Sequence, residues 1–389
     1  MYISRLSLQN WKNFQKASTH LPRRVFLIGP NASGKSNFLD AFRFLKDIAV
    51  SGLGYAVDSR GGVSPIRCLA ARASSSVLLQ VELVEDDESP AWEYTVDFSQ
   101  DAHRKPIIKR EIVRNLVTGE TILDRPSRND TADPLLLTQT SLEQISANKE
   151  FRPIADFLAS VTYQHLVPQV VRDPKGFSSV PVSNDPYGRD LLMRIHGTAA
   201  NVRDARLKRI GLVLRQAVPQ LQSLEIEMDS RGSPHLIGRY EHWRSHAAKQ
   251  NESQFSDGTL RLLGLMWAML DGDGPILVEE PELSLHPEVV RSLPQMLLSL
   301  QKEIRRMRKK REDYSNRQII ISTHSEEMLS DRGIAPGEVI RIESGSEGSA
   351  LVSASADDRA LMERGGLSAA DVLLPKSGPK GEQLFFEFP

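Results

Sequence analysis

Residues 29–36 read GPNASGKS, a glycine-rich stretch that ends in a lysine and a serine. An apolar run at residues 25–28 precedes it and an amphipathic pattern at residues 38–48 follows it, so the stretch lies between an expected strand and an expected helix. Gly29 and Gly34 allow the backbone to wrap closely around phosphate oxygens, at the positive end of that helix. The spacing predicts a phosphate-binding loop rather than a glycine turn without chemical purpose.

The lysine and the serine give this loop its chemistry. Lys35 is expected to bridge the β- and γ-phosphates of ATP, and Ser36 to give its hydroxyl to Mg²⁺. ATP and Mg²⁺ are therefore the expected cofactors. The residues expected to contact the nucleotide in this part of the chain are Gly29, Pro30, Asn31, Ala32, Ser33, Gly34, Lys35, Ser36 and Asn37.

A second group of residues able to contact a phosphate lies far along the chain. Ser256, Asp257 and Gly258 stand directly before an apolar helical pattern at residues 260–269, so they occupy an expected helix N-terminus. The economical arrangement is for this anion site to meet the γ-phosphate held by a second subunit. A simple helix cap is an equally good interpretation of these residues alone.

Two acids and a histidine end two further apolar runs. Glu279 and Glu280 follow the run at residues 276–278, and His324 comes shortly after the run at residues 319–321. We expect Glu279 to hold the metal and Glu280 to orient or deprotonate the attacking water. His324 is expected at the same sheet edge, near the γ-phosphate. Lys35, Glu280 and His324 are thus the candidate catalytic residues; a solvated acidic turn and a structural histidine are the alternatives.

Composition excludes several classes of protein. The chain has 49 Lys and Arg residues against 50 Asp and Glu, which is not the strong basic bias of many nucleic-acid binders. Cys68 is the only cysteine, which excludes an intramolecular disulfide and favours a reducing compartment. The first residues lack an apolar signal core, and no apolar run has the length of a membrane span. We expect a cytoplasmic protein without a membrane partner.

The pattern along the chain predicts three parts. Residues 1–119 read as an ATPase lobe with alternating strands at 76–84, 92–98 and 105–117, and residues 120–245 as a loosely organised helical insertion. This insertion includes a helix over 190–217 and two strands, at 223–228 and 235–240, that return to the sheet. Residues 246–389 form the second ATPase lobe. The sequence has no sustained heptad pattern, so we expect no coiled-coil arm.

These motifs resemble the ABC-type ATPase heads of the SMC, RecF and OLD group. GPNASGKS resembles the Walker A motif, FSDGTLR the signature, ILVEEPE the Walker B motif, SLHP the D-loop, and His324 the switch histidine. The stretches NWKNF, SDGTLRLL and EEPE…LHP are most similar to short standalone OLD-like AAA-type ATPases. The resemblance implies an α/β P-loop fold with an ABC-type head: a mixed sheet with an antiparallel first lobe, a parallel core and a small helical insertion. It also implies that Lys12, Asn13 and Phe14 lie near the adenine.

The chain departs from this family pattern in three respects. Glu279 stands where most relatives have aspartate, so a longer side chain must be accommodated. Gln80 is a candidate for the Q-loop glutamine, although a polar residue facing out of a sheet is the better interpretation. After His324 there is no pattern of the Toprim nuclease domain that full-length OLD nucleases carry.

The resemblance implies a homodimer, or a higher assembly, that senses or clamps DNA and regulates a Toprim- or HNH-type nuclease encoded nearby, in anti-phage defence. The alternatives are a RecF- or SMC-like maintenance ATPase, a transporter ATPase subunit, and a module that closes on ATP without turnover. DNA could bind the basic run at residues 302–311, which includes Arg305, Arg306, Arg308, Lys309, Lys310 and Arg311. A solvated helix face is the favoured interpretation of that run.

Overall fold

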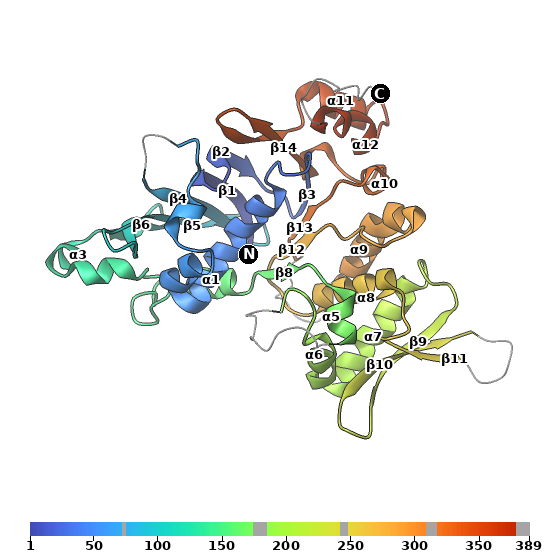
Figure 1. Cartoon of the computed structure of the whole chain (residues 1–389). Coiled ribbons are helices and arrows are strands. Elements are labelled where there is room, and N and C mark those ends of the chain that lie inside the picture. The colour runs from blue at the N-terminus through green and yellow to red at the C-terminus, as the bar shows by residue number, and fades with distance from the viewer. Residues whose placement is uncertain (72–74, 174–184, 242–247, 309–316, 379–389) are drawn as a thin grey trace, which may run out of the picture.

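The computed structural model of the chain describes residues 1–71, 75–173, 185–241, 248–308 and 317–378, with the backbone alone for 301–308. Its described strands form three sheets. Figure 1 shows the first sheet, whose strands lie within residues 2–20 and 77–125, with helix α1 (Lys35–Asp58) at one side of the molecule. The third sheet, within residues 221–251, lies at the opposite end, and the core sheet, which contains the remaining strands, lies between them. The predicted class, a mixed α/β fold, is confirmed.

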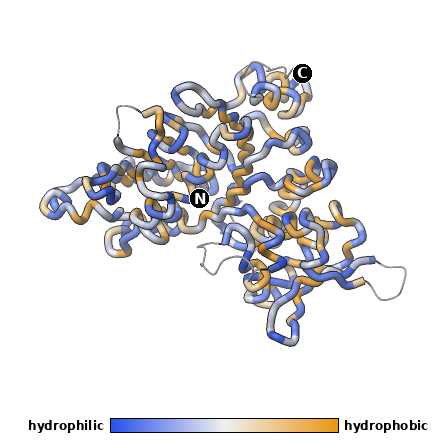
Figure 2. The backbone as a smooth tube through the Cα atoms, in the orientation of Figure 1, coloured by the Kyte–Doolittle hydropathy of each residue, from blue (hydrophilic) through white to orange (hydrophobic). Residues whose placement is uncertain are grey.

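The core sheet lies at the centre, where hydrophobic segments gather in Figure 2. Its strands run in the order β15-β14-β3-β13-β12-β8 and are parallel, except for the antiparallel hairpin of β14 and β15. Because successive side chains of a strand point to opposite faces, Val25 and Ile320 enter one core while Phe26 and Ile321 enter the other. The strands are β3 (Arg24–Ile28), β8 (Thr162–Gln164), β12 (Ile276–Glu279), β13 (Ile319–Ser322), β14 (Val339–Gly345) and β15 (Gly348–Ser353).

The first sheet is antiparallel, as the alternating pattern predicts, with the strand order β2-β1-β4-β5-β6-β7. Aromatic residues of α1 (Lys35–Asp58) pack against it: Phe44 stacks on Phe98 and lies 5.1 Å from Trp11 between ring centroids. The sheet extends past the expected boundary at residue 119, because β7 completes it. Its strands are β1 (Tyr2–Trp11), β2 (Phe14–His20), β4 (Val77–Val84), β5 (Pro90–Gln100), β6 (Pro106–Asn115) and β7 (Thr121–Arg125).

The third sheet contains the two strands expected near residues 223 and 235. They form β9 (Leu221–Met228) and β10 (Pro234–Tyr240), but they pair with each other and with β11 (Ala248–Asn251) instead of returning to another sheet. The helix expected over 190–217 is two helices, α6 (Leu191–Gly197) and α7 (Ala200–Leu214). Gly197 favours the break, and the Thr198 hydroxyl donates to the Arg194 carbonyl at 2.9 Å, where it competes with the helical backbone.

The remaining described helices surround the sheets, and among the described residues none combines the length and apolar character needed to cross a membrane. The basic run was expected on a helix, and its residues 302–308 do lie on the last turns of α9 (Pro287–Arg308). Its residues 309–311 lie outside the described residues. These elements are α2 (Val63–Ile66), α3 (Arg128–Ala132), η1 (Pro134–Thr138), α4 (Arg152–Ala159), α5 (Pro168–Arg172), α8 (Asp257–Leu270), α9 (Pro287–Arg308), α10 (Glu326–Leu329), η2 (Pro336–Glu338), α11 (Ala356–Glu363), α12 (Ala369–Val372) and η3 (Pro375–Ser377).

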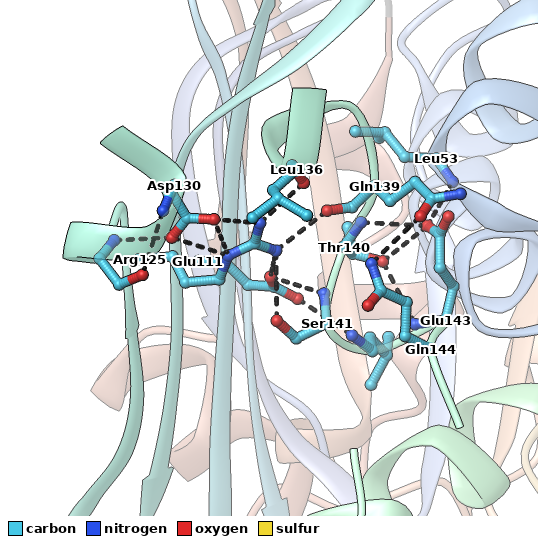
Figure 3. A network of polar contacts seen from close by, with 12 residues as sticks. Leu53, Glu111, Arg125, Asp130, Leu136, Gln139, Thr140, Ser141, Glu143 and Gln144 are labelled. Atoms are coloured by element: carbon cyan, nitrogen blue, oxygen red, sulfur yellow. Dashed lines mark hydrogen bonds and ion pairs between the residues drawn. The ribbon is translucent and has the colours of Figure 1, made fainter. Parts of the chain in front are cut away.

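Residues 126–148, expected to be loosely organised, are fastened by a buried polar network (Figure 3). The Arg125 guanidinium donates to Glu111 at 3.0 Å, to Asp130 at 2.6 Å and to the Leu136 carbonyl at 2.7 Å. Glu143 accepts from the backbone N–H of Leu53 at 2.9 Å, just after a kink in α1. The network therefore attaches this segment to both the first sheet and α1.

Candidate nucleotide-binding and hydrolytic site

The predicted phosphate loop lies between β3 and α1, and both of its glycines are required by the backbone. Gly34 has a φ of 109°, and a Cβ there would lie 2.0 Å from Nδ2 of Asn13. A Cβ at Gly29 would lie 2.5 Å from the carbonyl oxygen of Ile342 on β14. Side chains at either position would therefore displace the loop. The loop ends at the N-terminus of the 24-residue helix α1, where backbone N–H groups favour an anion.

Lys35 folds back over this loop. Its Nζ donates to the carbonyl oxygens of Gly29 at 3.0 Å and Pro30 at 3.1 Å, and its side chain is buried. Burial lowers the pKa of the Lys35 ammonium, while the nearby carboxylates of Glu280 and Glu279 act in the opposite direction. An incoming phosphate group would therefore compete with these two neutral carbonyl groups for the Lys35 ammonium.

Asn13 and Ser349 clamp the loop from outside. Asn13 Nδ2 and Ser349 Oγ both donate to the carbonyl oxygen of Ser33, at 2.7 and 2.6 Å. The other amide atom of Asn13, Oδ1, accepts from Asn37 Nδ2 at 2.8 Å. The structure thus places Asn13 and Asn37, both expected to contact the nucleotide, at the loop. It also places Ser349 there, a residue that sequence reasoning missed.

A hollow of about 540 Å³ opens beside the start of α1. Its lining includes Lys12, Asn13, Asn37, Arg67 and Cys68. Lys12 itself is paired with Asp40, at 2.6 Å between Nζ and Oδ2. This volume lies in the range of small-molecule sites, and it adjoins the phosphate loop through Asn13 and Asn37.

Glu279 ends β12 and touches two hydroxyl groups. Ser36 Oγ donates to one of its carboxylate oxygens, Oε1, and the Tyr163 hydroxyl donates to the other, Oε2. Ser36 and Glu279, the two residues expected to serve the metal, are therefore in contact in the folded chain. Tyr163, which lies on the neighbouring strand β8, is a contact that sequence reasoning missed.

Glu280 follows Glu279 and has a left-handed backbone, with a φ of 45°. Such a conformation is strained for a residue with a side chain, and it occurs preferentially at functional sites. Here it turns the chain at the end of β12, and Oε1 of Glu280 lies 3.4 Å from Nε2 of His324. Burial, followed by the charge of Lys35, lowers the pKa of His324, so its imidazole is neutral at neutral pH.

Glu282 is a third acid that the sequence analysis did not use. Its Oε1 accepts from the Thr323 hydroxyl at 2.6 Å and from the His324 backbone N–H at 3.0 Å. Burial raises the pKa of this carboxyl. Glu282 therefore fastens the turn after β12 to the end of β13 and positions His324. The EEPE motif, with acids at 279, 280 and 282, was the feature of the sequence from which a role for Glu282 could have been predicted.

Ser256 caps α8, and in the described part of the chain its hydroxyl has partners within its own helix. Its Oγ accepts from the Thr259 N–H at 3.1 Å, and the residue is exposed. Asp257 pairs with Arg172 of α5 at 2.6 Å. Gly258 lies against the turn before α9, since a Cβ there would come within 2.6 Å of the Ser284 carbonyl oxygen. The cap interpretation is correct for the single chain, and the exposed serine remains free to face another subunit.

The candidate Q-loop residue does not lie at the site. Gln80 is on β4, paired in register with Ser7 and Thr95 of the first sheet. A different glutamine, Gln164, ends β8 beside Val278 of β12 and lines a small cavity together with Glu279. The signal for it was weak: a single glutamine after a three-residue run of β-forming residues in a proline-rich region.

The chain has the fold of an ABC-type P-loop ATPase head. The SMC head bound to the C-winged helix domain of ScpA is similar with a TM-score of 0.56 at 15% identity, over 92% of this chain and 98% of that one. The SMC head of Pyrococcus furiosus bound to the C-terminal domain of ScpA has a TM-score of 0.52 at 12% identity, covering 94% and 99%. The SMC head of Pyrococcus yayanosii, solved with a coiled coil and joint, has a TM-score of 0.50 at 11% identity, covering 94% of this chain and 99% of that one.

The family follows from the sequence. Residues 24–330 match the family described as "AAA domain, putative AbiEii toxin, Type IV TA system". The chain belongs to this AAA family. No curated protein matches the chain significantly. The predicted AAA membership and the predicted SMC-like head are thereby confirmed, while the narrower OLD-like assignment stays a prediction.

Proposed function

We propose that this chain binds and hydrolyses Mg·ATP as one half of a homodimer, and that the nucleotide state of the dimer controls a separate effector. One observation carries the catalytic part of the proposal. Residues that are far apart in sequence converge at the ends of β3, β12 and β13, where Ser36 contacts Glu279 and Glu280 lies 3.4 Å from His324. Ligands and reacting groups of α/β sheets gather at this edge.

In this proposal the phosphate loop binds the phosphates through its backbone N–H groups, and Lys35 turns to them. Phosphate oxygens are stronger acceptors than the two carbonyl groups it now contacts, because a charge-assisted hydrogen bond is the stronger kind. Ser36 and Glu279 offer the hard oxygen atoms that Mg²⁺ prefers, and they already touch each other. Mg²⁺ held there would neutralise charge between the β- and γ-phosphates.

Glu280 is the proposed general base, because its strained backbone presents the carboxylate at the end of the strand. It would orient the attacking water and accept its proton, while the neutral imidazole of His324 holds the Glu280 carboxylate in place. The hollow lined by Lys12, Asn13 and Asn37 is the proposed site of the nucleotide base. Asn13 then has two tasks, since it also fixes the shape of the phosphate loop.

The dimer is proposed from the start of α8, where Ser256 is exposed, Asp257 is half-buried and Gly258 is buried. In this proposal the exposed Ser256 caps the γ-phosphate of a second subunit. The effector is proposed from the motifs SDGTLRLL and EEPE…LHP, which resemble those of standalone OLD-like ATPases, and from the family description, which names a toxin–antitoxin system. Such a system has more than one component. A Toprim- or HNH-type nuclease encoded nearby, acting in anti-phage defence on DNA, is the partner we propose.

A second candidate function is a DNA-maintenance ATPase without a nuclease. It is supported by the similarity to SMC heads, two of which were solved with a domain of ScpA, a partner protein, bound to them. In that case the basic run at 302–311 is the proposed DNA contact. Both candidates share the ATPase site and differ only in what reads its state.

The proposal is tested with the purified full-length chain and three variants. Lys35→Ala should lose ATP binding, whereas Glu280→Gln should bind ATP but hydrolyse it about 10²–10⁴-fold more slowly. Glu363→Gln, an exposed glutamate at the end of α11, is the control and should behave as wild type. Wild-type turnover by Glu280→Gln would remove the role of this residue, and failure of the wild-type chain to bind ATP would overturn the whole proposal.

The same Glu280→Gln variant separates the two candidates when it is used as bait with the products of the neighbouring genes. Co-purification of a nuclease whose activity depends on the bait's nucleotide state supports the first candidate. ATP-dependent DNA retention without such a partner supports the second.

A further inference from the structure

The carboxylate of Glu279 is held from two sides by two different elements. Ser36, at the start of α1, donates to Oε1, and Tyr163, on β8, donates to Oε2. The strands β8 and β12 are parallel, with Tyr163 paired to Leu277. Because side chains two residues apart on a strand point the same way, Tyr163, Leu277 and Glu279 share the face that α1 covers.

The tyrosine ring is itself fixed. The Arg43 guanidinium of α1 lies over it, 4.3 Å from the ring centroid, and Arg43 is placed by Asp40 at 3.7 Å. Since a phenol is ordinarily protonated at neutral pH and an ionised carboxylate can only accept, the hydroxyl of Tyr163 is the donor in its hydrogen bond to Glu279.

We propose that Tyr163 is a positioning residue that locks the carboxylate of Glu279, so that Oε2 is turned to the tyrosine and Oε1 is left for the metal beside Ser36. A glutamate has one more rotatable side-chain bond than an aspartate, so an unrestrained Glu279 would sample orientations that do not serve the metal. The hydroxyl of Tyr163 removes that freedom. This inference rests on the proposed role of Glu279 in the function given above.

The test is the Mg²⁺ dependence of nucleotide binding by the full-length Tyr163→Phe variant, which keeps the ring and its stacking with Arg43. Binding of a fluorescent ATP analogue is followed as Mg²⁺ is titrated, and binding of Mn²⁺ is followed separately by electron paramagnetic resonance. Loss of an outer-shell partner costs about 10–100-fold in metal affinity. We expect a rise of that size in the half-saturating concentration of both ions, with unchanged analogue binding in EDTA.

Two controls make the result decisive. Tyr55→Phe removes the hydroxyl of a tyrosine that is 46% exposed on α1, and it should leave the titrations unchanged. Glu279→Asp shortens the carboxylate away from Tyr163, so adding Tyr163→Phe to it should have no further effect on metal binding. Thermal melting without metal verifies that each variant is folded.

A wild-type Mg²⁺ and Mn²⁺ dependence of folded Tyr163→Phe would overturn the inference, as would full additivity of Tyr163→Phe and Glu279→Asp. Failure of the wild-type chain to show any metal-dependent ATP binding would instead overturn the proposed function. An unfolded Tyr163→Phe chain would also contradict a purely positioning role, since such a role leaves the ring packing intact.

Discussion

At the scale of single residues, His324 lies between charges of opposite sign, and its proton affinity reports on the site. Burial lowers its pKa most, the charge of Lys35 lowers it further, and the carboxylate of Glu280 raises it. Folded His324 therefore binds a proton less readily than the same residue in the unfolded chain. Its contribution to stability is lost as the pH falls below about 6.5, where the unfolded histidine takes up a proton.

Two substitutions should move the pKa of His324 in opposite directions. Lys35→Met removes a positive charge and should raise it, whereas Glu280→Gln removes a negative charge and should lower it. The measurement is a pH titration of the imidazole resonances by NMR, with His324→Gln to identify the signal. Equal values in wild type and both variants would mean that the three side chains are not neighbours in solution.

Residue types and spacing were enough to predict most of the residues that meet here, because each follows a recognisable apolar strand. Lys35, Ser36, Glu279, Glu280 and His324 all belong to this group. Tyr163 and Gln164 could not be predicted in the same way: β8 has three residues, and such a short strand is specified by its pairing with β12 rather than by a pattern of its own. Ser349 contacts the loop only because the core sheet brings β15 beside it.

At the scale of elements, the segment after β7 shows how a buried charge can organise a stretch that lacks hydrophobic periodicity. Residues 126–148 contain many polar residues and two prolines, which predicts irregular structure. The structure is irregular but fixed, because Arg125 satisfies two acids and three backbone or hydroxyl acceptors at once (Figure 3). Sequence periodicity detects apolar faces and cannot detect such a network.

Removing Arg125 should therefore unfold this part of the chain. Arg125→Ala leaves Glu111, which is fully buried, without its cation, and such a loss costs about 3–5 kcal/mol of the free energy of unfolding. Arg110→Ala is the matched control: it breaks a cross-strand pair with Asp124 on the same sheet whose side chains are 55% and 52% exposed, so we expect at most about 1 kcal/mol. Urea denaturation measures both, and similar small effects would show that the network contributes little.

At the scale of the whole molecule, our proposal leaves one part of the nucleotide site, a donor above the γ-phosphate, to a second subunit. Ser256, the N-cap of α8, is exposed, and in our proposal it faces a partner subunit. In a two-fold symmetric dimer, each site then combines the phosphate loop of one subunit with the Ser256 segment of the other. Two subunits with different defects can therefore form a mixed dimer in which one of the two sites is intact.

Mixing two inactive variants tests this arrangement. Lys35→Ala and Ser256→Arg subunits should each have little ATPase activity alone, and a mixed dimer should contain one intact site. Random exchange at equal amounts makes about half of the dimers mixed, so about a quarter of wild-type activity is expected if the two sites act independently. Activity that stays at the level of the separate variants would argue for sites confined to single chains.

The core sheet places β3 between β13 and β14, so the strand that leads into the phosphate loop pairs with strands that are synthesised about 290 residues later. Residues 24–28 leave the ribosome first and must wait for residues 319–342, which at roughly 5–20 residues per second takes about 15–60 s. Pairing across such separations is also slow to form. A nascent chain therefore lacks both neighbours of β3 until about residue 342 has been translated, and in our proposal ATP cannot stabilise it earlier. During that interval β3 must be protected by chaperones or by the first sheet, whose last strand, β7, ends at Arg125 and is therefore synthesised early.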